Sequence, residues 1–86
     1  MKLVFDLEYD MAYVHFTAGK DLHHTERPFS IDENGNVVGL SMYHLSQGAD
    51  LTHPRIPRNH IPELARRLRR KGHRVIVPRG EPATAG

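Results

Sequence analysis

The chain has 86 residues, of which 26% are charged, and it contains no cysteine. A domain of this length buries only about 60–65% of its unfolded surface, and without cysteine it has no disulfide, thiolate ligand or cysteine nucleophile. The net charge of +2 conceals two unequal halves. Residues 1–50 carry three basic and eight acidic side chains, and residues 51–86 carry nine basic and two acidic ones. This asymmetry points to a nucleic-acid surface, or to acidic and basic faces that meet in a dimer.

Localisation and assembly follow from the same composition. No apolar run approaches the length of a membrane-spanning helix, and the first ten residues carry acids where a signal peptide would be apolar. We therefore expect a cytoplasmic protein. A thin core with no covalent staple also favours a homodimer.

Two strands are predicted near the N-terminus, because residues 2–6 and 11–17 alternate between apolar and polar side chains. Asp6, Glu8 and Asp10 lie between them and raise the question of a cation-binding loop. A calcium loop of the EF-hand type needs glycine at its sixth position and glutamate at its twelfth, and this segment has neither. Since aspartate side chains accept hydrogen bonds from nearby backbone amides, we interpret the segment as a hairpin turn.

Two further strands are expected before residue 46. Residues 22–31 form a strand that is at an edge, bulged or interrupted, because Pro28 removes a hydrogen-bond donor. The pair Asn34-Gly35 is the strongest short hairpin signal. It leads into a strand over 37–45, in which Gly39 indicates a bulge or a close approach of another group to the backbone. Residues 1–46 are therefore predicted to form an antiparallel four-stranded β-meander.

The rest of the chain is predicted to complete the same single domain with a helix. Residues 47–59 are expected to be a proline-containing linker, and residues 60–78 a basic helix followed by a short fifth strand over 73–78. The helix carries an apolar stripe and ends at the capping glycine Gly72. The stripe consists of Ile61, Leu64, Ala65 and Leu68. Residues 79–86 are expected to be a disordered tail. The fold class is α+β, with the helix packed on one face of the sheet.

The hairpins resemble those of the small bacterial domain-of-unknown-function family 2283. The resemblance covers about residues 3–46. It is carried by Asp6, Asp10, Tyr13, Val14 and Gly19, by Ile-Asp-Glu-Asn-Gly-Asn-Val-Val-Gly-Leu at 31–40, and by Ser46. It implies a β-meander in a small cytosolic protein and, more weakly, an antitoxin-like role in binding a partner. Ser41 replaces an acidic residue of the family pattern, so no role of that carboxylate carries over.

The seven histidines offer only a weak metal site. Their spacing matches neither the H-x-H pattern of a strand nor the H-x-x-x-H pattern of a helix. Adjacent strands could bring His15 beside His23 or His24, with Glu26 as a carboxylate ligand. Solvent-facing strand histidines are the favoured interpretation, so no metal and no cofactor are expected.

Catalytic patterns are absent from the sequence. Ser30, Ser41 and Ser46 lack the G-x-S-x-G context of an activated nucleophile, and no glycine-rich phosphate loop links a strand to a helix. We therefore expect no catalytic residue and no enzymatic activity.

The arginines of the second half form the main candidate recognition surface. Residues 55–74 hold eight basic side chains and one acidic one. The candidate contact residues for a partner or a nucleic acid are Arg58, Arg66, Arg67, Arg69, Arg70 and Arg74. The favoured function is a homodimeric, non-enzymatic protein-interaction module. Its protein partner would be encoded by a neighbouring gene or, if the gene is carried by a phage, by the host. The alternatives are a nucleic-acid-binding protein that uses the arginines on phosphates, and a metal-dependent enzyme that uses the strand histidines.

Overall fold

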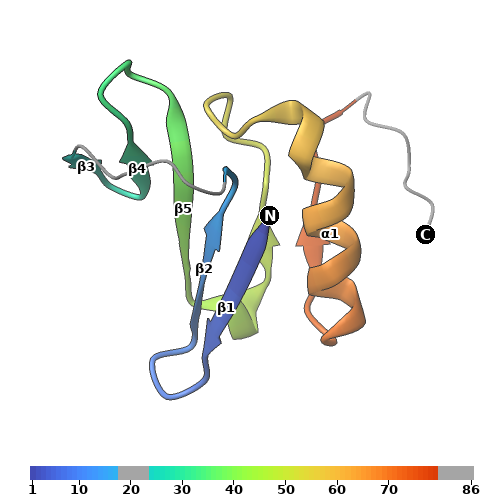
Figure 1. The fold of residues 1–86 in the computed structure, drawn as a ribbon. Coiled ribbons are helices and arrows are strands. Elements are labelled where there is room, and N and C mark those ends of the chain that lie inside the picture. The colour runs from blue at the N-terminus through green and yellow to red at the C-terminus, as the bar shows by residue number, and fades with distance from the viewer. Residues whose placement is uncertain (18–23, 80–86) are drawn as a thin grey trace. The chain divides into compact units, whose positions relative to one another are not determined.

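The computed structural model describes residues 1–17 and 24–79, which fall into two compact units (Figure 1). The first unit is Met1–His44 and contains a five-stranded sheet, and the second begins at Leu45 and contains the helix and a two-stranded sheet. The predicted α+β fold class is confirmed. The sequence predicted one domain with its meander ending at residue 46, whereas the two units divide between His44 and Leu45. No helix in the described ranges is long and apolar enough to cross a membrane.

All pairings in the first sheet are antiparallel, but the strand order differs from the predicted meander. The strands are β1 (Lys2–Asp6), β2 (Met11–His15), β3 (His24–Glu26), β4 (Phe29–Ile31) and β5 (Val37–Tyr43). Their order is β1-β2-β5-β4-β3 (Figure 1), so β5 lies between β2 and β4. The prediction of simple sequential neighbours is therefore wrong. Pairing β2 with β5 places the two strands richest in alternating apolar residues side by side.

The strand predicted over 22–31 is divided into β3 and β4. A turn at Arg27 and Pro28, with a cis peptide bond between them, joins the two short strands into a hairpin. The predicted interruption at Pro28 is confirmed, and β3 is an edge strand. The first two residues of the predicted strand lie outside the described ranges.

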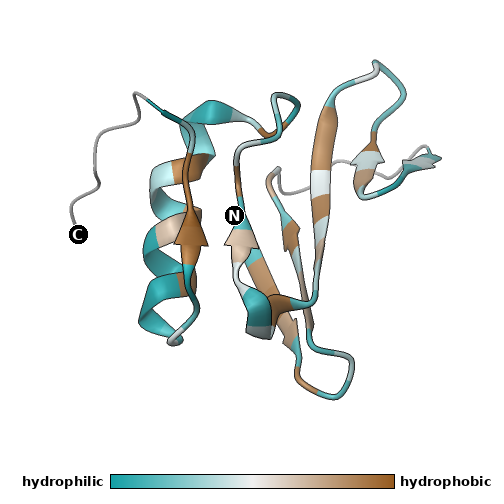
Figure 2. Cartoon of the chain, turned by 180° about the vertical axis from the view of Figure 1, so that it is seen from behind, coloured by the Kyte–Doolittle hydropathy of each residue, from teal (hydrophilic) through white to brown (hydrophobic). Residues whose placement is uncertain are grey.

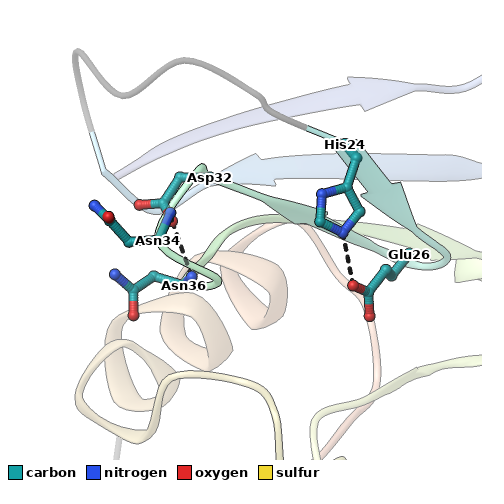
Figure 3. Close-up of polar contacts among 5 residues, drawn as sticks. All are labelled: His24, Glu26, Asp32, Asn34 and Asn36. Carbon is teal, nitrogen blue, oxygen red and sulfur yellow. Dashed lines mark hydrogen bonds and ion pairs between the residues drawn. The ribbon is translucent and has the colours of Figure 1, made fainter.

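The hairpin predicted at Asn34-Gly35 joins β4 to β5 and is organised by Asp32. The buried carboxylate of Asp32 accepts hydrogen bonds at 2.9 Å from the backbone amides of Asn34 and Asn36 (Figure 3). The backbone amide of Gly35 also donates to the carbonyl of Asp32, at 3.1 Å. Gly35 has a φ of 82°, a conformation that side chains with a Cβ disfavour. Turn chemistry visible in the sequence therefore determines this hairpin.

Gly39 has both features that its position in the sequence predicted. The register between β4 and β5 shifts at Ser30 and Ile31, which marks a bulge in β5 beside Gly39. The ring of Tyr13 also lies against Gly39, since a Cβ at that position would be 2.3 Å from the Tyr13 hydroxyl oxygen. That hydroxyl donates to Ser30 Oγ at 3.2 Å. An aromatic ring from β2 thus covers the glycine of the neighbouring strand.

The two faces of this sheet differ in burial. Ala12 and Val14 on β2 and Leu40 and Met42 on β5 are buried, with exposed fractions of 0–7%. Cross-strand pairs join Ala12 to Met42 and Val14 to Leu40, so all four residues belong to one face. The alternate residues of both strands form the other face, whose Tyr13 is only half-buried. This is the pattern of an antiparallel sheet with one face in a core.

The second unit begins with short elements where a linker was predicted. They are the 3-10 turn η1 (Leu45–Gln47), the strand β6 (Ala49–Asp50) and the 3-10 turn η2 (Arg58–His60). Leu51 and Ile56, in the loop between β6 and η2, are 0% and 3% exposed. The interpretation of residues 47–59 as a linker is therefore wrong, because this segment contributes a strand and two core side chains.

The helix α1 (Ile61–Arg70) has the predicted apolar stripe and the predicted end. Ile61, Leu64, Ala65 and Leu68 are 0–1% exposed. Most of the rest of α1 is hydrophilic (Figure 2). After Arg70 the backbone amide of Gly72 bonds to the Arg69 carbonyl at 2.9 Å, and that of His73 to the Leu68 carbonyl at 3.0 Å. This pair of bonds is a Schellman cap, and Gly72 has the positive φ, 92°, that it requires.

The predicted fifth strand is short and pairs within the second unit. β7 (Val75–Ile76) pairs in parallel with β6, and α1 lies between the two in sequence. Parallel neighbours need such a crossover connection, and a helix commonly provides it. The placement of α1 on a face of the first sheet stays a prediction. The disordered tail predicted over 79–86 falls, apart from Arg79, outside the described residues.

Candidate interaction surfaces

The exposed side of α1 carries arginines that were predicted from the sequence to contact a partner or a nucleic acid. Arg66, Arg69 and Arg70 are exposed. With 3.6 residues per turn, Arg66 and Arg70 lie on the side of the helix opposite the buried stripe. Glu63 is the one acidic side chain of α1, and it forms an ion pair with Arg67. We call Arg66, Arg69 and Arg70 the arginine surface.

The other candidate arginines have different environments. Arg67 is half-buried and forms an ion pair with Glu63 at 2.6 Å, one helical turn earlier. A partly exposed pair of this kind stabilises a helix by only about 0.3–0.5 kcal/mol. Arg58 is exposed in η2, immediately before α1, and Arg74 is exposed immediately before β7. All six predicted contact residues thus lie in the second unit, and Arg67 forms an ion pair with Glu63.

A second surface, which was not predicted from the sequence, consists of the open face of the five-stranded sheet and the turn between β1 and β2. Val4 pairs with Tyr13, and Met11 pairs with Tyr43. Val4 and Tyr43 are 48% and 47% exposed. Leu7 and Tyr9, in the turn between β1 and β2, are 83% and 70% exposed. We call Val4, Leu7, Tyr9, Met11, Tyr13 and Tyr43 the aromatic patch.

The aromatic patch has an acidic rim. Asp6 and Glu8 are exposed and Asp10 is half-buried, and all three lie in or beside the β1–β2 turn. The structure makes this segment a hairpin turn, as predicted. The Tyr9 amide donates to Asp6 Oδ1 at 3.3 Å, and Asp10 has a φ of 53°. The carboxylates that raised the question of a cation loop therefore lie in or beside the turn that carries the exposed Tyr9.

The histidines do not form the arrangement that a metal site would need. His15 is on β2 and His24 is on β3, and the sheet order places β5 and β4 between these strands. The less favoured alternative, in which adjacent strands bring His15 beside His24, is therefore wrong, and His23 lies outside the described residues. His24 instead forms an exposed ion pair with Glu26, Nε2 to Oε2, at 2.7 Å (Figure 3). Within the described ranges no three histidine, aspartate or glutamate side chains could hold a metal ion.

His15 has an unusual environment for a polar side chain. Its Nε2 atom is buried and has no hydrogen-bond partner among the described residues. Its ring lies edge-on to that of Tyr13, with 6.3 Å between centroids. His15 therefore belongs to the ring packing around Tyr13 on the open face of the sheet, rather than to the solvent-facing class that the sequence favoured.

Asp50, in the second unit, has a lowered pKa. Asp50 Oδ1 accepts hydrogen bonds from the Thr52 hydroxyl at 2.6 Å and from the Thr52 amide at 2.9 Å. These bonds, the hydroxyl bond first, lower the pKa of Asp50 because they stabilise its charged form. Asp50 is exposed, and its bonding orders the chain just after β6.

A depression in the second unit gathers further basic groups. It is lined by Ser46, Gln47, Arg69, Gly72, His73 and Arg74. These residues come from η1, from the C-terminal end of α1 and from the segment that enters β7. Sequence reasoning missed the depression because η1 is 22 residues before Arg69, and no local pattern links the two.

Comparison of the chain with protein-family models, curated proteins and solved structures finds no match. The resemblance of residues 3–46 to family 2283 therefore stays a prediction.

Proposed function

We propose that the protein is a non-enzymatic protein-interaction module that self-associates, with the aromatic patch of one copy receiving the arginine surface of another. The supporting observation is the exposure of Val4 and Tyr43, on the open face of a sheet whose other face is buried. Leu7 and Tyr9 are exposed in the adjoining β1–β2 turn, beside the exposed carboxylates of Asp6 and Glu8. Four of the five exposed large hydrophobic residues of the described chain belong to this patch. Clustering of this kind marks interaction sites, whereas scattered exposed apolar residues are ordinary.

The chemistry of the two surfaces is complementary. Arginine stacks its planar guanidinium on tyrosine rings and pairs with carboxylates, and both arginine and tyrosine are enriched where protein interfaces gain most of their affinity. The aromatic patch offers Tyr9 and Tyr43 beside Asp6 and Glu8. Two aromatic patches facing each other would instead bring like charges together. The aromatic patch of one copy is therefore expected to bind the arginine surface of the second copy.

Net charge supports the same pairing. Residues 1–44 hold three basic and seven acidic side chains, a net charge of −4, and residues 45–86 hold nine basic and three acidic ones, a net charge of +6. Opposite fields steer such surfaces together, and salt weakens the contact. We expect weak self-association, with a dissociation constant on the order of 10–100 μM at low salt, as for small transient interfaces.

Charge reversal tests the pairing. One variant carries Asp6→Lys and Glu8→Lys, and the other carries Arg66→Glu and Arg70→Glu. Each variant alone should associate at least about tenfold more weakly in sedimentation velocity, because like charges then face each other. An equimolar mixture should associate again, since each reversed surface then meets its complement on the other variant.

A matched control separates a specific contact from a change in net charge. Arg55→Glu with Arg79→Glu changes the charge by the same amount as the arginine-surface variant, away from α1. This control should retain most of the association. A wild-type chain that stays monomeric at low salt up to about 1 mM, or a mixture that fails to associate, would refute the proposal.

Nucleic-acid binding is the second candidate, supported by the exposed arginine surface itself. Phosphate contacts release counterions, so affinity for a duplex would fall linearly with the logarithm of salt concentration. Arg66→Ala with Arg70→Ala would flatten that slope by about 2. No binding at low salt would exclude this candidate, and its test is independent of self-association.

A further inference from the structure

We propose that the depression between the end of α1 and the start of β7 is an oxyanion-binding site that takes the phosphate group of a small phosphomonoester. Its lining contributes two guanidinium groups, one imidazole, one hydroxyl and one carboxamide, and no acidic side chain. Arg69 also belongs to the arginine surface, so the two proposals are distinguished by their variants: this site is tested at Arg69 and Arg74, and self-association is tested at Arg66 and Arg70.

The two arginines come from different elements and line the same depression. Arg69 lies in the last turn of α1, and Arg74 follows the Schellman cap by two residues. A guanidinium carries five N–H donors, so it can bind a ligand in addition to contacts within the chain. Hydrogen bonds from arginine to phosphate are charge-assisted and are about twice as strong as those between neutral groups.

The tight turn at Gly72 lies between Arg69 and Arg74 and brings both side chains to the same depression. Gly72 closes it through its bond to the Arg69 carbonyl, and the Arg74 carbonyl accepts a bond from the Ala49 amide at 2.8 Å. The backbone on both sides of the depression is therefore fixed by hydrogen bonds. Ser46 and Gln47, in η1, add uncharged donors from a third segment. Donors from three segments suit a tetrahedral oxyanion better than a planar carboxylate.

The C-terminus of a helix ordinarily repels an anion, because its last carbonyls carry partial negative charge. Here the carbonyls of Leu68 and Arg69 are occupied by the amides of His73 and Gly72. The cap reduces the exposed negative charge at the point where the depression lies. The depression, about 670 Å³ in volume, is largely open to solvent, so the alcohol portion of a phosphomonoester can extend away from the phosphate into solvent.

An NMR titration of the full chain with inorganic phosphate, at constant ionic strength set by sodium chloride, tests the site. The backbone amide signals of Ser46, Gly72, His73 and Arg74 should shift and saturate, with a dissociation constant on the order of 1–10 mM for an open two-arginine site. Adenosine monophosphate should bind at the same residues at least as tightly, and acetate at least about fivefold more weakly.

Two variants with equal changes of charge provide the control. Arg69→Gln with Arg74→Gln should weaken phosphate binding by at least about tenfold. Arg66→Gln with Arg70→Gln should leave it within about twofold, because these side chains do not line the depression. Equal losses in the two variants would show diffuse attraction to a basic unit and would overturn the proposal. Shifts that do not saturate, or that appear elsewhere, would overturn it as well.

Discussion

The contact between Tyr13 and Gly39 gives the most specific prediction about the first unit. Replacing Gly39 by alanine would place a Cβ 2.3 Å from the Tyr13 hydroxyl oxygen and 2.9 Å from the adjoining ring carbon. Gly39 has no positive φ, so its backbone accepts alanine, and the Tyr13 ring is the main obstacle, with Ser30 Cβ, at 3.2 Å, a second and milder one. In Gly39→Ala the ring must therefore move away from the strand.

The expected change in the free energy of unfolding follows from the interactions that the displaced Tyr13 ring loses. The hydrogen bond from Tyr13 to Ser30, at 3.2 Å, contributes about 1 kcal/mol. About 40 Å² of re-exposed ring area contributes about another 1 kcal/mol at 25 cal/mol per Å². Alanine in a strand regains about 0.5–1 kcal/mol relative to glycine. Gly39→Ala should therefore lower the free energy of unfolding by about 1–1.5 kcal/mol, and the melting temperature by about 4–12 °C.

A double-mutant cycle isolates the contact. In a Tyr13→Ala background the ring is gone and only Ser30 Cβ, at 3.2 Å, must yield slightly, so Gly39→Ala should instead raise the free energy of unfolding, by at most about 0.5–1 kcal/mol. The coupling energy is then about 2 kcal/mol, measured by urea unfolding of the wild type, both single variants and the double variant. Effects that add to within about 0.5 kcal/mol would refute the interpretation that the ring covers Gly39.

Three further predictions concern single polar or turn residues. Asp32→Ala removes two 2.9 Å bonds to backbone amides of the β4–β5 turn and should lower the free energy of unfolding by about 2–3 kcal/mol in urea. Gly72→Ala, at a φ of 92°, should lower it by about 1 kcal/mol and reduce the helical circular-dichroism signal on heating. Thr52→Val should raise the pKa of Asp50 in an NMR titration. Because the folded pKa of Asp50 is lowered, its stabilising effect is present above about pH 4 and is lost as the pH falls, so Thr52→Val should weaken this acid dependence.

The features that the sequence predicted correctly are those determined by local chemistry. The apolar stripe of α1 follows from the helical period, and its end follows from Gly72. The β4–β5 hairpin follows from Asn34-Gly35, and the break between β3 and β4 from Pro28. In each case the decisive groups lie within a few residues of one another. Local propensity and turn geometry therefore agree with the final structure.

The features that the sequence did not predict depend on contacts between distant segments. The pairing of β2 with β5 crosses more than 20 residues, and no turn signal specifies it. Leu51 and Ile56 are isolated apolar residues among prolines and polar groups, so their burial gives no periodic pattern. The exposure of the arginines could be predicted from the helical period.

The aromatic patch could not be predicted in this way. Alternation along a strand divides its residues between two faces, but it does not show which face stays exposed when both carry apolar side chains.

The open face of the sheet combines two roles that follow from the position of each aromatic ring. Tyr13 is half-buried against Gly39 and fills the gap left by the missing side chain, so its apolar area stabilises the single chain. Tyr9 and Tyr43 are 70% and 47% exposed, so most of the ring area of Tyr9 and about half that of Tyr43 add no burial to an isolated chain. Apolar area of this kind gains free energy only when another surface covers it, at about 25 cal/mol per Å². Because the rim is acidic, a basic surface covers it with the least electrostatic cost, and the chain carries such a surface on α1.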